Sequence, residues 1–239
     1  MERVFHVKNR SEFLKYLDSV SKINDSAIFD IKSDSITSLV SSADNTLILL
    51  SEFVTESNFT TTINVPDIKK LYRVLETINE DEFDLKINGN NLEYKGKNLK
   101  FKYHLFEEGF LTRPNLNIEK IRNFTYDVTF NITKAVLQQL FKGSTFASET
   151  NKVYIYTEDG DLKAELTDRA RHNTDNFTIT IDSADFQLEP IPINFDNIRL
   201  MSAIDNDYTF NVNTDHGVVV VDNNSNSIKL KYIISSLTQ

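Results

Sequence analysis

Apolar and polar residues alternate with a period of two along most of the chain, which is the pattern of strands that bury one face. Turn signals rich in Asn, Asp and Gly separate these segments, as at 88–91 and 158–161, and they favour hairpins over parallel crossovers. The sequence therefore predicts mainly antiparallel sheet, with strands at 2–7, 27–31, 46–53, 59–65, 83–87, 100–104, 126–130, 152–156, 162–166, 177–181, 208–212 and 229–233.

Four segments carry the 3.6-residue period of an amphipathic helix: 11–23, 66–78, 133–146 and 195–204. An asparagine precedes each of them, at Asn9, Asn64, Asn131 and Asn194. Asparagine is a favoured N-cap because its side-chain oxygen accepts a hydrogen bond from the first helical turn. The first and third asparagines are 122 residues apart and the second and fourth are 130 apart, which indicates an internal repeat.

These elements predict an α+β fold in which a β-α-β-β-β-α-β-β-β unit occurs twice. We expect one domain at 1–105 and a second at 124–239. The segment between them, 106–123, contains a Gly and a Pro and has poor periodicity, which is typical of a connector.

Charge is distributed unevenly along the chain. The 239 residues include 26 Lys and Arg and 35 Asp and Glu, a net charge of −9, which alone argues against a polyanionic partner. The helical segments 8–23, 66–78, 131–145 and 195–204 nevertheless hold ten of the cations and only five of the acids, so they carry +5 and the remainder −14.

On a helical projection the cations lie opposite the apolar faces, only loosely so in the fourth helix. We interpret them as one basic surface that faces a polyanion, against the alternative that they only solvate the helices. The predicted DNA-facing residues are Lys8, Lys15, Lys22, Lys69, Lys70, Arg73, Lys134, Lys142 and Arg199.

Several classes of chemistry lack support in the sequence. The chain has no cysteine, so disulfides, zinc–thiolate sites and thiol nucleophiles are excluded. Neither a GxGxxG nor a GxxxxGK[ST] motif is present, the four histidines show no metal-binding spacing, and no serine lies in a GxSxG context. We therefore expect a protein that is not an enzyme and that has no cofactor or metal. The apolar runs are too short to span a membrane, and the first residues do not predict a signal peptide.

The order of the elements, together with several short strings, resembles the DNA polymerase sliding clamps, and most closely those of T-even-type bacteriophages. The strings are 132–142 with the hairpin 153–162, then 193–201, and 228–233 before a short tail. The resemblance implies a PCNA-like fold, with antiparallel sheets outside and four helices inside a pseudo-sixfold ring. Because this chain has two domains, such a ring requires three copies.

The resemblance also implies partners: duplex DNA bound without sequence preference, a replicative DNA polymerase, a clamp loader ATPase, and two further copies of the chain. No membrane is involved, and the expected location is the cytoplasm of an infected bacterial host. By position, the residues that would line a pocket for partner peptides are Val40, Leu47, Leu116, Ile118, Tyr232 and Ile234.

Ring closure would pair one exposed strand edge of each subunit with an edge of the next. The residues predicted at this subunit interface are Leu99, Phe101, Tyr103, Phe177, Ile179 and Ile181. Two other functions stay open. One is a tandem β-domain structural or virion protein that binds an acidic partner, and the other is a hydrolase, for which the sequence offers only dispersed carboxylates.

Overall fold

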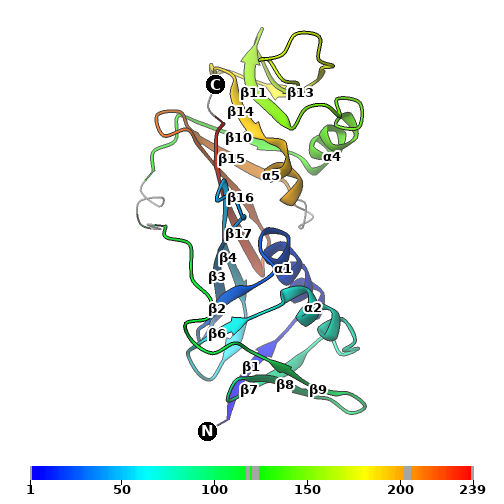
Figure 1. Cartoon of the computed structure of the whole chain (residues 1–239), viewed down its shortest axis with the longest axis vertical. Helices are drawn as coiled ribbons and strands as arrows, with labels where there is room; N and C mark the ends of the chain where they lie inside the picture. The colour runs from blue at the N-terminus through cyan, green and yellow to red at the C-terminus, as the bar shows by residue number, and fades with distance from the viewer. Residues whose placement is uncertain (1, 117–118, 120–123, 202–205, 238–239) are drawn as a thin grey trace. The chain divides into compact units, whose positions relative to one another are not determined.

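Figure 1 shows the computed structural model, which describes residues 2–116, 119, 124–201 and 206–237. The chain forms two compact units. The first comprises Met1–Leu116 and Asn224–Lys231, and the second comprises Asn117–Asn223 and Tyr232–Gln239. Residues 224–231 fall in the range 124–239 that the sequence assigns to the second domain, yet they group with the first unit.

The first unit contains two helices and two antiparallel groups of strands. Its sheets have the orders β5-β1-β7-β8-β9 and β6-β2-β3-β4. In chain order its elements are β1 (Arg3–Val7), α1 (Arg10–Ile23), β2 (Ala27–Ile31), β3 (Ser35–Ser41), β4 (Leu47–Val54), β5 (Glu56–Ser57), β6 (Thr61–Val65), α2 (Ile68–Glu76), β7 (Phe83–Asn88), β8 (Asn91–Lys95) and β9 (Lys100–His104).

The second unit repeats this order. One sheet runs β13-β12-β11-β14, and β10, β15 and β16 are consecutive antiparallel neighbours. Its elements are β10 (Val128–Ile132), α4 (Lys134–Gly143), β11 (Lys152–Glu158), β12 (Asp161–Leu166), β13 (Phe177–Ser183), β14 (Ile191–Asn194), α5 (Phe195–Leu200), β15 (Tyr208–Asn213), β16 (Val218–Asn224) and β17 (Ile228–Ser235), of which β17 begins in the first unit.

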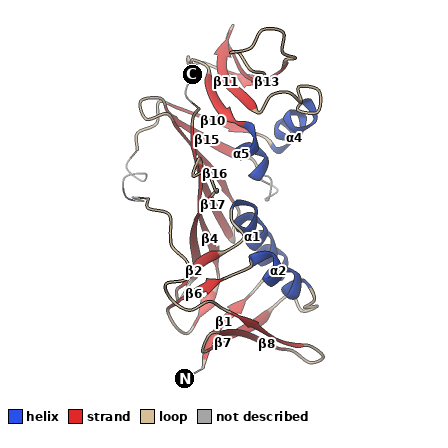
Figure 2. Cartoon of the chain, in the orientation of Figure 1, coloured by secondary structure: helices blue, strands red, loops and turns tan. Residues whose placement is uncertain are grey.

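The predicted α+β fold with a repeated unit is confirmed. Four helices are present among the described residues, and Figure 2 shows them against sheets in each unit. With the two-residue β5 set aside, each repeat has one strand more between its helices than the predicted order contains, because β3 and β14 show no clear alternation in the sequence. In the first unit an aromatic cluster of Phe13, Tyr16 and Phe53 joins α1 to β4, with ring centroids 5.1 to 6.2 Å apart.

Two of the four predicted helix caps are correct. The side chains of Asn9 and Asn194 accept hydrogen bonds from the backbone N–H groups of Glu12 and Asp196, both at 3.0 Å. The other two predictions are wrong, because Asn64 lies in β6 and Asn131 in β10. Asp67 and Thr133, which directly precede α2 and α4, cap those helices instead.

Candidate functional site

The nine cations predicted to face DNA lie on or next to the helices, and all of their side chains are exposed or half-exposed. Lys8 precedes α1, which carries Lys15 and Lys22. The other six are distributed over the remaining helices: Lys69, Lys70 and Arg73 on α2, Lys134 and Lys142 on α4, and Arg199 on α5.

Ion pairs within the chain offset five of these cations. Lys15 pairs with Glu12 at 3.3 Å, Lys22 with Asp18 at 3.1 Å, Lys69 with Asp25 at 2.7 Å, Arg199 with Asp196 at 2.7 Å, and Lys8 with Glu56. Exposed pairs of this kind contribute about 0–1 kcal/mol each, so a stronger anion can compete for the cation. Glu12, Asp18 and Asp196 are already part of the count of +5 for the helical segments, so only Asp25 and Glu56 make the helix faces less positive than that count.

Three of the nine cations have no ion pair with any carboxylate in the described part of the chain. They are Lys70 and Arg73 on α2 and Lys142 on α4, and all three are exposed. Lys70 and Arg73 are three residues apart, so they are neighbours on one side of the helix. These three side chains are the strongest candidates for phosphate contacts.

Each unit has one strand with an open edge at the position predicted for a subunit interface. β9 ends the order β5-β1-β7-β8-β9, and β13 ends the order β13-β12-β11-β14. Within the described residues, β9 therefore pairs only with β8, and β13 only with β12. Open backbone N–H and C=O groups on an edge strand are able to pair with a strand of another chain.

Side chains on β13 are also poorly covered. None of its seven residues is buried, and the apolar side chains of Phe177, Ile179 and Ile181 are half-exposed. Phe177 adjoins Phe146 in an open apolar hollow beside α4, and the Phe146 side chain is 60% exposed. An uncovered strand of this composition next to an exposed phenylalanine is typical of a protein interface.

The two open edges carry opposite charge. Segment 95–104, the end of β8 together with β9, contains Lys95, Lys97, Lys100 and Lys102 and no acid. Segment 173–189, which includes β13, contains Asp175, Asp182, Asp185 and Glu189 and no Lys or Arg. None of the four lysines has an ion pair within the described residues. The edges are therefore complementary in charge as well as in backbone hydrogen bonding.

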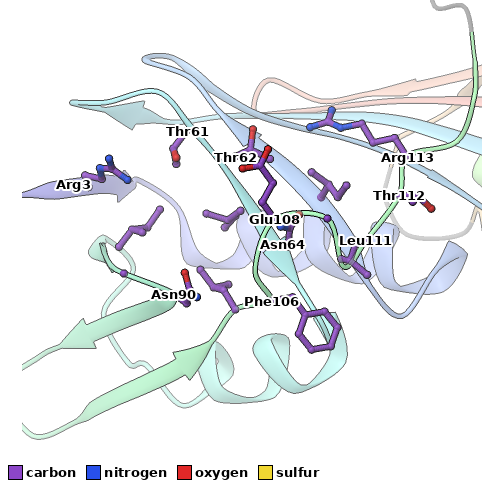
Figure 3. Close-up of a pocket in the computed structure, with 16 residues that line it drawn as sticks. Arg3, Thr61, Thr62, Asn64, Asn90, Phe106, Glu108, Leu111, Thr112 and Arg113 are labelled. Carbon is purple, nitrogen blue, oxygen red and sulfur yellow. The ribbon is translucent and has the colours of Figure 1, made fainter.

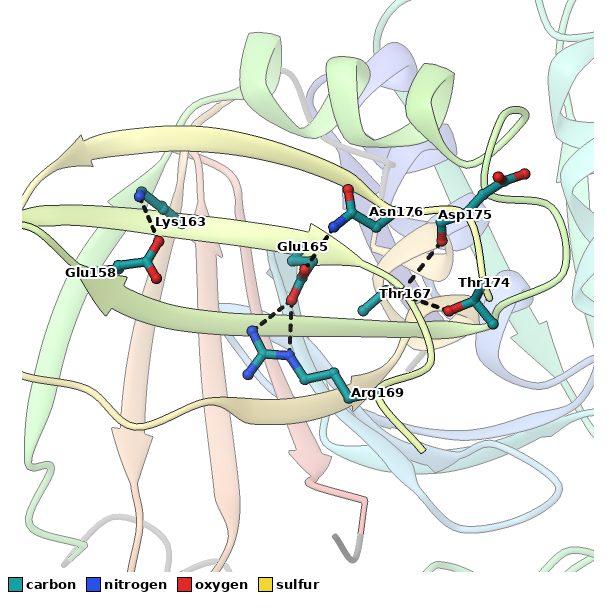
Figure 4. A network of polar contacts seen from close by, with 8 residues as sticks. All are labelled: Glu158, Lys163, Glu165, Thr167, Arg169, Thr174, Asp175 and Asn176. Carbon is teal, nitrogen blue, oxygen red and sulfur yellow. Dashed lines mark hydrogen bonds and ion pairs between the residues drawn. The ribbon is translucent and has the colours of Figure 1, made fainter. Parts of the chain in front are cut away.

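A polar network fixes the start of β13 (Figure 4). Glu165 on β12 accepts a hydrogen bond from Arg169 Nε at 2.8 Å and another from Asn176 Nδ2 at 3.2 Å. The Arg169 guanidinium lies 4.7 Å from the ring centroids of both Tyr154 and Tyr156. Cation–π contacts and charge-assisted hydrogen bonds together restrain the loop that leads into the open edge.

In the first unit, β17 and β4 make a contact that corresponds, by its place in the repeat, to a contact between the two open edges β9 and β13. Residues 228–231 of β17 lie beside β4, where Val54 N–H donates to Ser227 C=O at 2.8 Å and Lys229 pairs with Glu52 at 2.6 Å. By order in the repeat, with β5 again set aside, β4 corresponds to β13 and β17 to β9. A β13–β9 contact is thus the repeat equivalent of a contact that the chain already makes.

Of the residues predicted at the interface, Tyr103 has another role. Its side chain is buried, its hydroxyl donates to the Asp67 carbonyl at 2.7 Å, and it accepts from the Asp67 N–H at 3.1 Å. Burial raises the pKa of Tyr103 to about 12. Tyr103 therefore fixes the start of α2, whereas Leu99 and Phe101 are half-exposed.

A cleft of about 300 Å³ lies between the β2–β3 strands and residues Leu111–Pro114; we call it the connector cleft. Val40, one of the predicted pocket residues, is part of its lining together with Ile28 and Leu39. Arg113 holds the chain over the sheet through a bidentate ion pair with Asp30. The Arg113 guanidinium lowers the pKa of Asp30.

The other predicted pocket residues do not line this cleft. Leu47 is buried in the core of the first unit, and Tyr232 and Ile234 are buried in the second. Their alternating positions on strands direct these side chains inward, so they are unavailable to a peptide in this structure. Leu116 is half-exposed, and Ile118 lies outside the described residues.

The described residues offer neither a metal site nor a membrane-spanning helix. No group of three His, Asp or Glu side chains there is placed to hold a metal ion. None of the described helices is long and apolar enough to cross a membrane.

Sequence reasoning missed two features of these sites. The exposed Phe146 follows α4 in a segment assigned to the helix, and the Asp30–Arg113 pair joins residues 83 positions apart. The excess of Lys over acid in 95–104 was visible in the sequence and could have indicated the charged edge.

The fold is that of PCNA-type sliding clamps. The chain superposes with TM-score 0.77 on A. fulgidus PCNA in its complex with the C-terminal region of FEN-1, at 12% identity, covering 100% of this chain and 99% of that one. For Proliferating Cellular Nuclear Antigen from Entamoeba histolytica the TM-score is 0.76 at 12% identity, and the match covers 99% of this chain and 99% of that one. For PCNA from Thermococcus kodakaraensis the TM-score is 0.76 at 13% identity, and the match covers 98% of this chain and 100% of that one. No family model and no curated relative matches the sequence.

Proposed function

We propose that this chain is a sliding clamp: three copies close into a ring around duplex DNA and hold a replicative DNA polymerase on it. The observation that carries the proposal is the pair of open edges, β9 and β13, which correspond in the repeat to the strands β17 and β4 that already meet in the first unit. A head-to-tail contact between copies then continues a contact found within each copy, and such contacts form a ring when the rotation from copy to copy closes.

The role toward DNA requires only weak contacts. A closed ring is retained by its topology, so cations such as Lys70, Arg73 and Lys142 need only balance phosphate charge without reading sequence. A tethered polymerase that releases its primer rebinds before it diffuses away, because the tether keeps its effective concentration high. No residue of the chain has to perform chemistry in this function.

Partner proteins would dock in the connector cleft. It is concave, the half-exposed Ile28 lines it beside the buried Leu39 and Val40, and the Asp30–Arg113 pair fixes the segment that forms its other wall. One structural neighbour was solved with the C-terminal region of FEN-1 bound, which supports peptide docking as a mode for this fold. We expect the C-terminal peptide of the polymerase to occupy the cleft.

The remaining expectations are part of the same proposal. A closed ring has to be opened, so an ATP-driven clamp loader is expected as a partner. The resemblance to T-even-type phage clamps suggests a phage origin and a location in the cytoplasm of the infected bacterium. The division into domains 1–105 and 124–239 with a connector at 106–123 is retained as the working description.

Two measurements test the proposal. Sedimentation should give the mass of three chains, and the protein, once loaded, should remain on nicked circular DNA but leave linear DNA through its free ends. A monomer that binds both DNA forms equally, or neither, contradicts a clamp. Binding to an acidic protein with no retention on DNA would favour the structural-protein alternative.

A further inference from the structure

A second and larger cleft lies on the first unit, at the free edge of β6; we call it the edge cleft. It has a volume of about 850 Å³. Its walls come from β6, the β7–β8 turn, the start of β1 and residues 105–113. Figure 3 shows Arg3 and Arg113 at opposite ends of the edge cleft, with Thr62 and Glu108 between them.

The backbone of β6 is only partly paired along this cleft. β6 ends the order β6-β2-β3-β4, and on its outer side Asn64 C=O accepts from Phe106 N–H at 2.9 Å in an isolated bridge. Alternate residues of a strand direct their backbone groups to the same side, so the N–H and C=O of Thr62 also point outward. No backbone partner is present for them among the described residues.

Two further features of the edge cleft favour a ligand. Phe106 on its rim is 40% exposed and adjoins Phe110, which is 69% exposed, with ring centroids 5.6 Å apart. These are two of the four large apolar side chains that are exposed in the described residues. Arg3 at the far end is exposed and has no ion pair there, whereas Arg113 is paired with Asp30.

We propose that the edge cleft binds an extended peptide segment of a partner protein, which adds a strand to β6 at Thr62. An apolar or aromatic side chain of the segment packs on Phe106 and Phe110, and a carboxylate pairs with Arg3. Strand addition satisfies the outward N–H and C=O of Thr62, and alternate side chains supply selectivity. A nucleic acid strand fits less well, because Arg3 is the one cation without an ion pair among the described residues that line the cleft, and the acid Glu108 lies between Arg3 and Arg113.

This site is separate from the connector cleft. Ile28, Leu111, Thr112 and Arg113 border both clefts, but the remaining lining differs: β6 lines the edge cleft and β3 lines the connector cleft. The site also lies wholly within the first unit, so binding there does not require a ring.

The test uses the full chain and a library of random twelve-residue peptides displayed on phage. We expect enrichment of peptides that combine an aromatic or aliphatic residue with an acid. A synthetic peptide of the enriched sequence should bind at least about tenfold more weakly to Arg3→Glu and to Phe110→Ala. It should also slow hydrogen exchange of the Thr62 amide.

Matched controls are Lys32→Glu and Val54→Ala, which alter an exposed cation and an exposed apolar side chain outside the cleft. They should leave peptide affinity unchanged, and thermal melts should show that all four variants fold. Failure to enrich peptides, or enriched peptides insensitive to both cleft variants, overturns the proposal. A labelled oligo-dT that binds in their place and is sensitive to Arg3→Glu also overturns it, in favour of nucleic acid.

Discussion

At the scale of single residues, the side chain of Phe177 on β13 leaves no room for a residue larger than glycine at position 143, at the end of α4. A Cβ atom at Gly143 would collide with Cδ1 of that ring. Gly143→Ala should therefore destabilise the protein by about 1–3 kcal/mol through overpacking. In a Phe177→Ala background the clash is gone, and the same change should stabilise by about 0.5 kcal/mol, because alanine favours the helix. Urea denaturation of the wild type and the three variants measures both values. A Gly143→Ala effect of the same sign in both backgrounds contradicts the packing account.

The Asp30–Arg113 pair gives the connector a dependence on pH. Because Arg113 lowers the pKa of Asp30, the pair stabilises the protein above the ordinary carboxyl pKa of about 4, and this contribution is lost as the pH falls through the lowered value. Asp30→Asn should cost about 0.5–1 kcal/mol at pH 7 and almost nothing in strong acid. Denaturation at several pH values tests this. Asp34→Asn is the control, and equal losses for both variants would contradict a specific tether.

At the scale of elements, the start of α2 depends on Asp67. Its side chain accepts a hydrogen bond from Lys70 N–H at 2.8 Å, and its backbone is held by the Tyr103 hydroxyl. Asp67→Ala should cost about 0.5–2 kcal/mol, as the loss of an N-cap usually does. Asp25→Ala removes a nearby exposed carboxylate that pairs with Lys69 but caps no helix, and it should cost less than about 0.5 kcal/mol. If chemical denaturation shows a larger loss of stability for Asp25→Ala than for Asp67→Ala, then Asp67 does not stabilise the start of α2 as its N-cap.

The cap of α2 also shows what the sequence could not provide. Asn64 and Asp67 are both favourable capping residues, and only the end of β6 at Val65 decides between them. Long helices and alternating strands such as α1 and β7 were readable because one face of each is buried. β3 has buried residues on both faces and β16 begins with four valines, so neither alternates clearly.

For the sites, periodicity placed the cations on helices and predicted β9 and β13 as strands, because both follow from local pattern, whereas the choice of these two edges came from the resemblance to ring-forming clamps. It could not identify which cations are paired within the chain, since Lys69–Asp25 and Lys8–Glu56 join distant residues. Strand position likewise did not distinguish Val40, which borders a cleft, from the fully buried Leu47. Accessibility depends on which segments cover a strand, and that is a property of the fold.

At the scale of the whole molecule, opposite charge on the two open edges should control assembly. In the proposed ring, Lys100→Glu with Lys102→Glu places acids on β9 opposite the acids near β13 of the next copy, so the proposed trimer should dissociate at a protein concentration at least about tenfold higher. Asp182→Lys with Asp185→Lys should weaken it in the same way. In the chain that carries all four changes, the new acids on β9 again face cations near β13 at every subunit interface. This variant should assemble again, as sedimentation would show. If the fourfold variant is folded but stays monomeric, opposite charge on β9 and β13 does not control assembly.

The last prediction concerns the DNA face. Lys70, Arg73 and Lys142 are exposed cations without an ion pair in the described residues, so each is free to balance a phosphate. Their replacement by glutamine should leave the proposed trimer intact, because none lies on β9 or β13 and Lys142, which borders the hollow of Phe146 and Phe177, loses only its charge. It should reduce the slope of log affinity against log salt by about 0.9 for each phosphate that the variant no longer neutralises. Titration of a labelled duplex at several salt concentrations gives this slope.

The matched control must change net charge equally without touching the helices. Ser33→Asp, Asn173→Asp and Asn226→Asp add three negative charges at exposed loop positions. Because the proposed DNA face acts through local phosphate binding, this control should keep the wild-type salt slope and lose little affinity. If both triple variants lose affinity alike, only overall charge matters and the helices are not the DNA face. If the variant of Lys70, Arg73 and Lys142 keeps the wild-type slope of log affinity against log salt, then other cations of the chain contact the phosphates.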